Sequence, residues 1–259
     1  MPDIDADGCN IHVEVEGPER APVLMLSNSL GTDLSMWDDQ AAAFTRHFRL
    51  LRYDRRGHGK SGVPQGPYAM ERFGRDVLAV LDALDIERVN WCGLSMGGMV
   101  GQWLGANAPS RIDKLILSNT ACYYEDKKLW ADRIRFARTN GIPAVAAATM
   151  ERWFTRDFRE RAPETIARMT AMFVKTDIEG YLGCCEAIRD MDHRDLLPKI
   201  AAPTLVIAGR RDPATPLEAN AYIRDRIPGA KLTVVETAHL ANIEEPEAYT
   251  DAVLEFLLG

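Results

Sequence analysis

The chain has 259 residues, 46% of them hydrophobic and 27% charged, which is typical of one globular domain or of one domain with an inserted subdomain. Its net charge of −7 argues against a nucleic-acid partner, and its acidic N-terminus lacks the apolar core of a signal peptide. No apolar run approaches the roughly 20 residues of a membrane span. We therefore expect a cytoplasmic protein with neither nucleic-acid nor membrane partners.

Strand-like and helix-like segments alternate along most of the chain, which predicts a mostly parallel sheet wrapped by helices. The alternating pattern at 11–16 indicates an outer antiparallel strand. Apolar runs predict strands at 23–26, 50–54, 89–92, 115–118, 204–209 and 232–235, of which those at 23–26, 50–54 and 204–209 are expected to be buried. Helical patterns cover 70–84 and 98–107, and a closing helix is expected at 246–258 with Pro246 near its first turn.

The pattern changes between the strands at 115–118 and 204–209. From residue 127 to about 197 only helical periodicity is visible, with breaks at the glycine and proline positions 141–143, 163, 180 and 198. An all-helical insertion between two central strands is typical of a lid. We predict an α/β core of residues 1–122 and 199–259, and a helical cap of residues 123–198.

The cysteines do not resemble a disulfide framework or a metal site. Their number, five, is odd and their spacing is irregular, so we expect reduced thiols. No cluster of histidine, cysteine and carboxylate has metal-ligand spacing. The sequence predicts neither a metal nor another cofactor. The cysteines are Cys9, Cys92, Cys122, Cys184 and Cys185.

The most informative motif is Gly-x-Ser-x-Gly at 93–97. An apolar, β-like run precedes it and a helix-like segment follows it. A serine on a sharp turn from strand to helix projects its hydroxyl outward, and the flanking glycines permit the strained turn. The N-terminus of the following helix offers unpaired N–H groups to a developing oxyanion. The motif predicts Ser95 as a nucleophile.

A serine hydroxyl requires a base, and the base requires an orienting acid. Asp212 lies in a turn directly after the strand at 204–209, and His239 follows the strand at 232–235. Taken alone, an aspartate after a strand is usually a turn residue and a loop histidine is usually structural. Their order after Ser95, each at a strand end, favours a catalytic triad.

His58 is the chief rival for the role of base. It lies in a glycine-rich turn at 53–61 and precedes Ser95 in the chain. Because this order does not fit a triad of the Ser, Asp, His type, we predict a structural role for His58.

An oxyanion hole requires two backbone N–H groups. We expect one from Met96, directly after the nucleophile. The other is expected from the loop at 27–32, where position favours Ser29 and Leu30 is the alternative.

Over nearly its whole length the chain resembles the α/β-hydrolase superfamily. Four motifs carry the resemblance: Tyr-Asp-x-Arg-Gly-His-Gly-x-Ser at 53–61, Gly-Leu-Ser-Met-Gly-Gly at 93–98, Gly-x-x-Asp-x-x-Thr-Pro at 209–216 and Ala-His-Leu-Ala-Asn-Ile-Glu-x-Pro at 238–246. The resemblance implies an α/β-hydrolase fold with a mostly parallel, eight-stranded sheet flanked by helices. It also implies that the all-helical cap is inserted after the sixth strand.

One departure from the superfamily pattern narrows the resemblance to a single group of enzymes. Most relatives have His-Gly after the second strand, where this chain has Ser27-Asn28. The segment at 26–37 and the cap segments at 130–141, 152–155 and 176–188 are similar to those of the 3-oxoadipate enol-lactonases of aromatic (protocatechuate or catechol) degradation. That resemblance implies a small unsaturated γ-lactone with an acetate arm as the substrate, hydrolysed to 3-oxoadipate without a cofactor.

The acetate arm is ionised at neutral pH, and burying a carboxylate requires a cationic partner. Arg133 lies three residues after Trp130 and hence on the same helix face. We expect both to bind the substrate and Trp153 to shape the wall of the pocket. A solvated helix face for Arg133 and plain packing for the two tryptophans remain the alternatives.

Several readings stay open at this point. The reaction proceeds through an acyl-enzyme on Ser95, or by direct attack of water with His239 as base. A related carboxylesterase or C–C bond hydrolase acting on a small carboxylate-bearing substrate is the competing function, and a ligand-binding receptor with a hydrolase shell is a third. The sequence does not decide between a monomer and a homo-oligomer.

Overall fold

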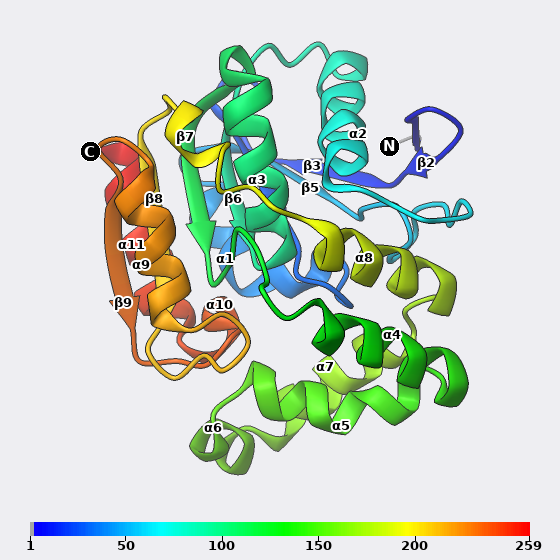
Figure 1. Ribbon diagram of the computed structural model, residues 1–259. Coiled ribbons are helices and arrows are strands. Elements are labelled where there is room, and N and C mark those ends of the chain that lie inside the picture. The colour runs from blue at the N-terminus through cyan, green and yellow to red at the C-terminus, as the bar shows by residue number, and fades with distance from the viewer. Residues whose placement is uncertain (1–2) are drawn as a thin grey trace.

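The computed structural model describes residues 3–259 and contains a mixed sheet of seven strands in the order β3-β5-β4-β6-β7-β8-β9 (Figure 1). Only the edge pair of β3 and β5 is antiparallel, and the other neighbours are parallel. The strands are β3 (Val13–Glu16), β4 (Val23–Ser27), β5 (Arg49–Tyr53), β6 (Val89–Leu94), β7 (Ile112–Ser118), β8 (Thr204–Gly209) and β9 (Lys231–Val235). The predicted α/β architecture with a mostly parallel sheet is confirmed.

The sheet has seven strands and not the eight that the resemblance implied. The segment 11–16 was expected to be one strand but is divided, because the His12 N–H donates to Ser61 Oγ (2.9 Å). Before this break, β2 (Asn10–Ile11) pairs with β1 (Ile4–Asp5) in a separate two-stranded sheet. In chain order the helical insertion therefore follows the fifth strand of the main sheet, β7, and not the sixth.

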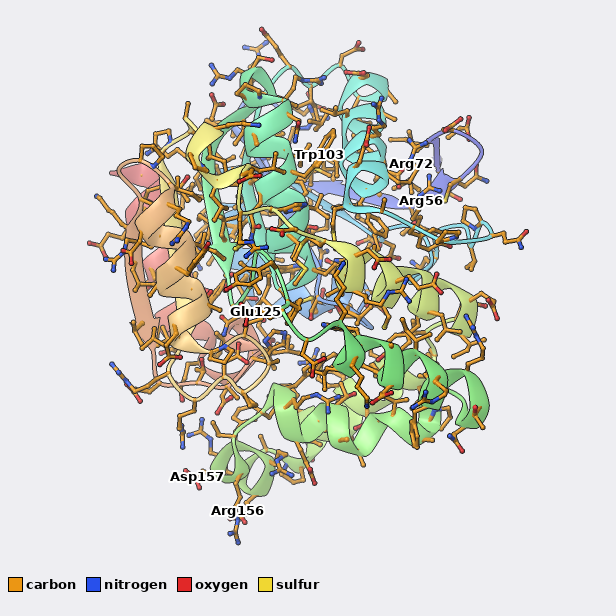
Figure 2. The ribbon with its side chains drawn as sticks, viewed as in Figure 1. Arg56, Arg72, Trp103, Glu125, Arg156 and Asp157 are labelled. Atoms are coloured by element: carbon orange, nitrogen blue, oxygen red, sulfur yellow. The ribbon has the colours of Figure 1, made fainter. Side chains whose placement is uncertain are left out.

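Helices cover both faces of the sheet, as two-sided burial of a parallel sheet requires. In Figure 1, α2 (Met70–Ala83) and α3 (Met96–Asn107) lie in front of the sheet, and α1 (Asp38–Phe44) and α11 (Pro246–Leu258) lie behind it. A Cβ at Gly74 would lie 2.0 Å from the Trp103 ring, so a larger residue there would separate α2 from α3. Figure 2 shows Trp103 between these two helices.

The remaining helices of the core are short or lie near the C-terminal strands. They are η1 (Leu34–Trp37), η2 (Pro109–Arg111), η3 (Leu197–Lys199), α9 (Leu217–Arg226) and α10 (Ala241–Glu244). In the part of the chain from residue 3 to 259, no helix is both long and apolar enough to cross a membrane.

Five α-helices form between β7 and β8: α4 (Lys127–Asn140), α5 (Ile142–Trp153), α6 (Arg156–Arg161), α7 (Pro163–Val174) and α8 (Ile178–Asp190). Side chains of Asp126, Thr155 and Asp177 cap the first turns of α4, α6 and α8. In Figure 1 these helices lie beyond the carboxyl ends of the strands. The assignment of residues 123–198 as a separate unit stays a prediction.

The two ends of this insertion meet at its base. Tyr123 and Asp192 form an isolated antiparallel bridge, and the His193 N–H donates to the Cys122 carbonyl (2.8 Å). The chain therefore leaves the sheet at β7 and returns beside its exit point before entering the neighbouring strand β8.

Candidate active site

Ser95 occupies a strained turn between β6 and α3. Its φ is +57° and its ψ is −114°, a region that residues with a side chain rarely adopt. The two motif glycines are required by close backbone approach: a Cβ at Gly93 would lie 2.2 Å from the Gly97 oxygen, and a Cβ at Gly97 would lie 2.1 Å from the Ser27 oxygen. The predicted turn from strand to helix is present at this position.

Hydrogen bonds from neighbouring strands hold this turn. The Ser95 N–H donates to the Ser118 carbonyl (2.8 Å), and Thr120 Oγ1 donates to the Ser95 carbonyl (2.7 Å). The Gly97 N–H donates to the Asn28 carbonyl (3.0 Å). The strain at Ser95 is therefore maintained by contacts from β7 and from the loop that follows β4.

Asp212 and His239 are in direct contact. His239 Nδ1 lies 2.8 Å from Asp212 Oδ2, which also accepts hydrogen bonds from Thr215 Oγ1 (2.6 Å) and Asn119 Nδ2 (3.1 Å). Asp212 Oδ1 accepts from the N–H groups of Ala214 (2.8 Å) and Thr215 (3.1 Å). With Oδ2 facing the ring, the imidazole presents Nε2 as the basic nitrogen.

The environment keeps Asp212 ionised. Burial of this carboxyl acts to raise its pKa, but the positive charge of a protonated His239 and the hydrogen bonds from His239, Thr215 and Asn119 lower the pKa below its ordinary value. An ionised Asp212 stabilises the imidazolium that forms when His239 accepts a proton.

The three residues stand at one edge of the sheet. Ser95 follows β6, Asp212 follows β8 and His239 follows β9, and these strands belong to the neighbouring run β6-β7-β8-β9. All three side chains lie beneath the cap, with Ser95 7% exposed and Asp212 and His239 each 4% exposed. Among residues 3–259, Ser95 Oγ and His239 form no hydrogen bond. Such catalytic contacts are often long without substrate and tighten in the complex.

The backbone N–H groups of the loop at 27–32 differ in whether they already donate a hydrogen bond. The Ser29 N–H donates to Met36 Sδ (3.3 Å), and the Gly31 N–H donates to His58 Nε2 (2.9 Å). Within the described residues 3–259, the N–H groups of Leu30 and Met96 donate to no protein atom. The Leu30 N–H belongs to the loop that follows β4, and the Met96 N–H belongs to the first residue of α3, directly after Ser95.

His58 supports this loop. It is buried, and its Nδ1 lies 3.8 Å from Cys184 Sγ while its Nε2 accepts the hydrogen bond from Gly31. Burial and the neighbouring Arg55 charge lower the pKa of His58 to about 3, so it is neutral at physiological pH. These contacts support the structural role predicted for it.

The cap places Trp130 and Arg133 together on α4. Arg133 Cζ lies 5.2 Å from the Trp130 ring centroid and 5.5 Å from that of Tyr181 on α8. Arg133 Nε donates to Tyr181 Oη (2.6 Å). The shared helix face expected from their spacing is present, with the guanidinium stacked on aromatic rings.

Trp153 connects the cap to the histidine loop through its backbone. Its carbonyl accepts hydrogen bonds from the N–H groups of His239 and Leu240 (both 3.1 Å). Its ring packs edge-on against Phe173, with the centroids 5.5 Å apart. The last residue of α5 therefore contacts the backbone of the loop that carries His239 directly.

Sequence reasoning missed Asn119 and Glu244. Asn119 follows β7 and reaches both Asp212 and the Ala238 carbonyl, the latter at 3.1 Å. The Glu244 carboxylate accepts hydrogen bonds from Thr155 and from the Ala238 N–H. A signal existed for each: Asn119 stands at a strand end like the triad residues, and Glu244 belongs to the motif around His239.

The described residues 3–259 contain no group of three or more His, Cys, Asp or Glu side chains placed to hold a metal ion. All five cysteines are buried free thiols. The chemistry this arrangement supports is acyl transfer, with a serine on a strained turn, a histidine paired to an ionised aspartate and two free N–H donors.

Comparison with known proteins identifies similar chains. A family model described as the alpha/beta hydrolase fold matches residues 22–246. The chain is 40% identical to 3-oxoadipate enol-lactonase 2 of Acinetobacter baylyi, covering 92% of this chain and 89% of that protein. It is 36% identical to 3-oxoadipate enol-lactonase 1 of the same organism, covering 93% and 91%. The crystal structure of the enol-lactonase from Burkholderia xenovorans LB400 superposes with a TM-score of 0.98 at 44% identity and covers 100% of both chains.

Proposed function

The chain belongs to the α/β-hydrolase family and is a hydrolase of ester or lactone bonds, and from this premise we propose that it converts 3-oxoadipate enol-lactone to 3-oxoadipate. The single observation that carries the proposal is the Arg133 guanidinium, which is stacked on Trp130 in the cap and makes no ion pair with a carboxylate of residues 3–259. A small lactone with an ionised acetate arm needs such a partner. The names of two relatives, both 3-oxoadipate enol-lactonases, support the same substrate. A role in aromatic degradation is part of the proposal.

Ser95, His239 and Asp212 act as the triad in this proposal. Ser95 Oγ attacks the ring carbonyl while His239 Nε2 takes its proton, and the Asp212 carboxylate stabilises the imidazolium. The N–H groups of Met96 and Leu30 bind the oxyanion. Leu30 replaces Ser29, which position alone favoured, because the Ser29 N–H already donates to Met36 Sδ.

The leaving group explains why the reaction runs in one direction. Ring opening releases an enol, which receives its proton from His239 and converts to the more stable ketone. A water molecule activated by His239 then attacks the acyl-enzyme carbonyl and frees the second carboxylate of 3-oxoadipate. Direct attack of water on the lactone gives the same product without an acyl-enzyme, so the two routes differ in whether Ser95 becomes acylated.

Three cap residues complete the proposed site. Arg133 pairs with the acetate carboxylate, Trp130 packs beside the arm and Trp153 shapes the wall next to the histidine loop. This division assigns chemistry to the strand ends and recognition to the cap.

The first test is an assay of the hydrolysis of freshly generated 3-oxoadipate enol-lactone. The loss of the lactone absorbance measures the rate. We expect kcat/KM of at least about 10⁴ M⁻¹s⁻¹ for the wild type, which is ordinary enzyme efficiency. In Ser95→Ala we expect kcat to fall by about 10⁴-fold or more. Mass spectrometry of the rapidly quenched wild-type protein then looks for the acyl group on Ser95.

Two outcomes would contradict parts of this proposal. Cleavage of a simple aryl ester without turnover of the lactone would keep the triad and discard the lactone, leaving the carboxylesterase or C–C hydrolase alternative. Full lactone turnover in Ser95→Ala would discard the nucleophile.

A further inference from the structure

Two arginines of the cap lack a carboxylate partner. Within residues 3–259, Arg133 and Arg152 have no carboxylate oxygen within ion-pair distance. Every other arginine between residues 123 and 198 forms an ion pair with a carboxylate: Arg135, Arg138, Arg156, Arg159, Arg161, Arg168, Arg189 and Arg194. The exceptions are both partly buried and lie on different helices, α4 and α5. Arginines of the cap are therefore generally paired with carboxylates, and these two are exceptions.

Most of the donors on these two guanidinium groups are unused. Arg133 donates only through Nε, to Tyr181 Oη (2.6 Å), and Arg152 donates only through one Nη, to Thr149 Oγ1 (3.2 Å), among the described residues. The Nε1–H of Trp130, on which Arg133 stacks, is also buried without an acceptor in this part of the chain. Both Nη groups of Arg133 remain free for a ligand.

The electrostatic surroundings of Arg152 include Arg133 and Tyr181, the residue to which Arg133 donates a hydrogen bond. Burial lowers the pKa of Arg152, and the positive charge of Arg133 lowers it further. Two partly buried like charges destabilise each other unless an anion lies between them. A ligand with a negative charge removes this repulsion and supplies the acceptors that the unused donors require.

Packing and hydrogen bonds connect the elements that carry both arginines to the loop of His239. Arg152 immediately precedes Trp153, whose carbonyl binds the backbone of His239. Edge contacts continue from the Trp153 ring to Phe173 (5.5 Å) and from Phe173 to Tyr181 (5.7 Å), the partner of Arg133. A carboxylate held by both arginines therefore belongs to a molecule that reaches from the inner face of the cap toward the strand ends.

We infer that Arg152 is a second substrate anchor, which together with Arg133 grips the carboxylate of the substrate arm. The identity of that substrate rests on the function proposed above. Guanidinium groups match carboxylates in bidentate geometry, so two of them select a carboxylate and reject a methyl group at the same position. The ligand class is short lactones and esters that end in a carboxylate.

The experiment compares two esters that differ only at the far end, mono(4-nitrophenyl) glutarate and 4-nitrophenyl valerate. For the wild type we expect a higher kcat/KM on the glutarate ester. In Arg152→Gln and in Arg133→Gln we expect the ratio of the two kcat/KM values to fall by about 10-fold or more, since each variant removes a charged hydrogen-bonding partner. Competitive inhibition by adipate is expected to weaken by a similar factor.

Arg156→Gln is the matched control. Arg156 is an exposed cap arginine paired with Glu160, and Figure 2 shows it at the outer end of the cap, pointing away from the molecule. It is expected to keep the wild-type ratio and the wild-type inhibition. A ratio in Arg152→Gln equal to that of Arg156→Gln, with unchanged adipate inhibition, would overturn the inference.

Two measurements keep the result interpretable. Thermal unfolding shows whether Arg152→Gln is folded. If it is not folded, Arg152→Met, which keeps the aliphatic stem, replaces it, and the same fall in the ester ratio and in adipate inhibition is expected. Failure of the wild type on the enol-lactone would overturn the proposed function, whereas the ester ratio and the adipate inhibition would still decide the role of Arg152.

Discussion

Asn119 links two parts of the site that arise from different strands. Its φ of +45° lies in the left-handed region, which asparagine tolerates better than most residues. Its backbone N–H donates to the Ile207 carbonyl (2.8 Å), while its Nδ2 reaches Asp212 and the Ala238 carbonyl (both 3.1 Å). One side chain thus orients the acid and the loop that carries His239.

Asn119→Asp is expected to change the pH profile of the reaction. The new carboxylate would face Asp212, and a like charge raises the pKa of a carboxyl group. Asp212 would then lose its charge at a higher pH as the solution is acidified, so the acidic limb of kcat/KM should move up by about one pH unit. The pH dependence of kcat/KM measures this shift. Asn107→Asp, at an exposed position, is the control, and identical profiles for the two variants would contradict the role of Asn119.

At the scale of residues, the sequence predicted what local motifs specify. Ser95 and its two glycines belong to one short segment, whose strained turn the structure contains. The position of Asn119 at a strand end was visible in the sequence, but its contact with Asp212 was not predictable, because that contact depends on the pairing of β7 with β8, which no local pattern encodes. The engagement of the Ser29 N–H by the Met36 sulfur was equally hidden.

Glu244, at the end of α10, joins three elements. Its buried carboxylate accepts hydrogen bonds from the Thr155 hydroxyl and N–H at the start of α6 and from the Ala238 N–H (3.0 Å) next to His239. The cap and the catalytic loop therefore share one buried anion. A buried acceptor with three donors fixes the relative position of the segments that supply them.

Glu244→Gln is expected to loosen this junction. An amide directs an NH₂ group at donors, so at least one buried donor loses its acceptor, which costs about 1–3 kcal/mol of stability. Urea unfolding measures this loss, and kcat is expected to fall with it because the loop of His239 is less well held. Glu245→Gln removes only an exposed ion pair with Arg161 and is expected to change stability by less than about 1 kcal/mol. Equal losses in the two variants would refute the role of Glu244.

At the scale of elements, apolar runs predicted the bounds of the parallel strands within a few residues, because burial on both faces of a strand leaves a strong signal. Helical spacing predicted the helix at 70–84 equally well. The division of segment 11–16 was missed, since it depends on the side chain of Ser61, which is distant in sequence. How the cap helices pack was also unpredictable: Gly57 and Gly180 meet so closely that a Cβ at Gly180 would lie 2.1 Å from the Gly57 oxygen.

Outside the Ser95–His239–Asp212 group, the molecule buries two histidines, His58 and His193, in their neutral form. Burial lowers the pKa of His58 to about 3 and that of His193 to about 4, against the ordinary 6.5. Both pKa values are lower in the folded than in the unfolded chain, so below pH 6.5 the unfolded chain binds more protons. Their contribution to stability is complete above that pH and is lost as the pH falls toward the folded-state values.

The free energy of unfolding is therefore expected to decrease on acidification below pH 6.5. Each histidine contributes at most about 1.4 kcal/mol per pH unit in the window between pH 6 and 4.5. Denaturant unfolding at several pH values measures the slope. His58→Gln, which retains an acceptor for the Gly31 N–H, is expected to reduce it. A slope in His58→Gln equal to that of the wild type would show that His58 is not buried in its neutral form.

The bridge between Tyr123 and Asp192 has a consequence for how such an enzyme changes over generations. Because the insertion is closed at its neck, a longer insertion adds only a slowly growing loop-closure entropy to the cost of folding the sheet. Selection, or an engineer, is therefore able to exchange helices of the insertion, provided that Trp153 and Thr155 keep their contacts with the segment around His239. The positions of the reacting groups are set by β6, β7, β8 and β9, whereas Arg133, Arg152 and Trp130 belong to the insertion. A changed insertion therefore brings new substrate contacts without rebuilding the reaction centre.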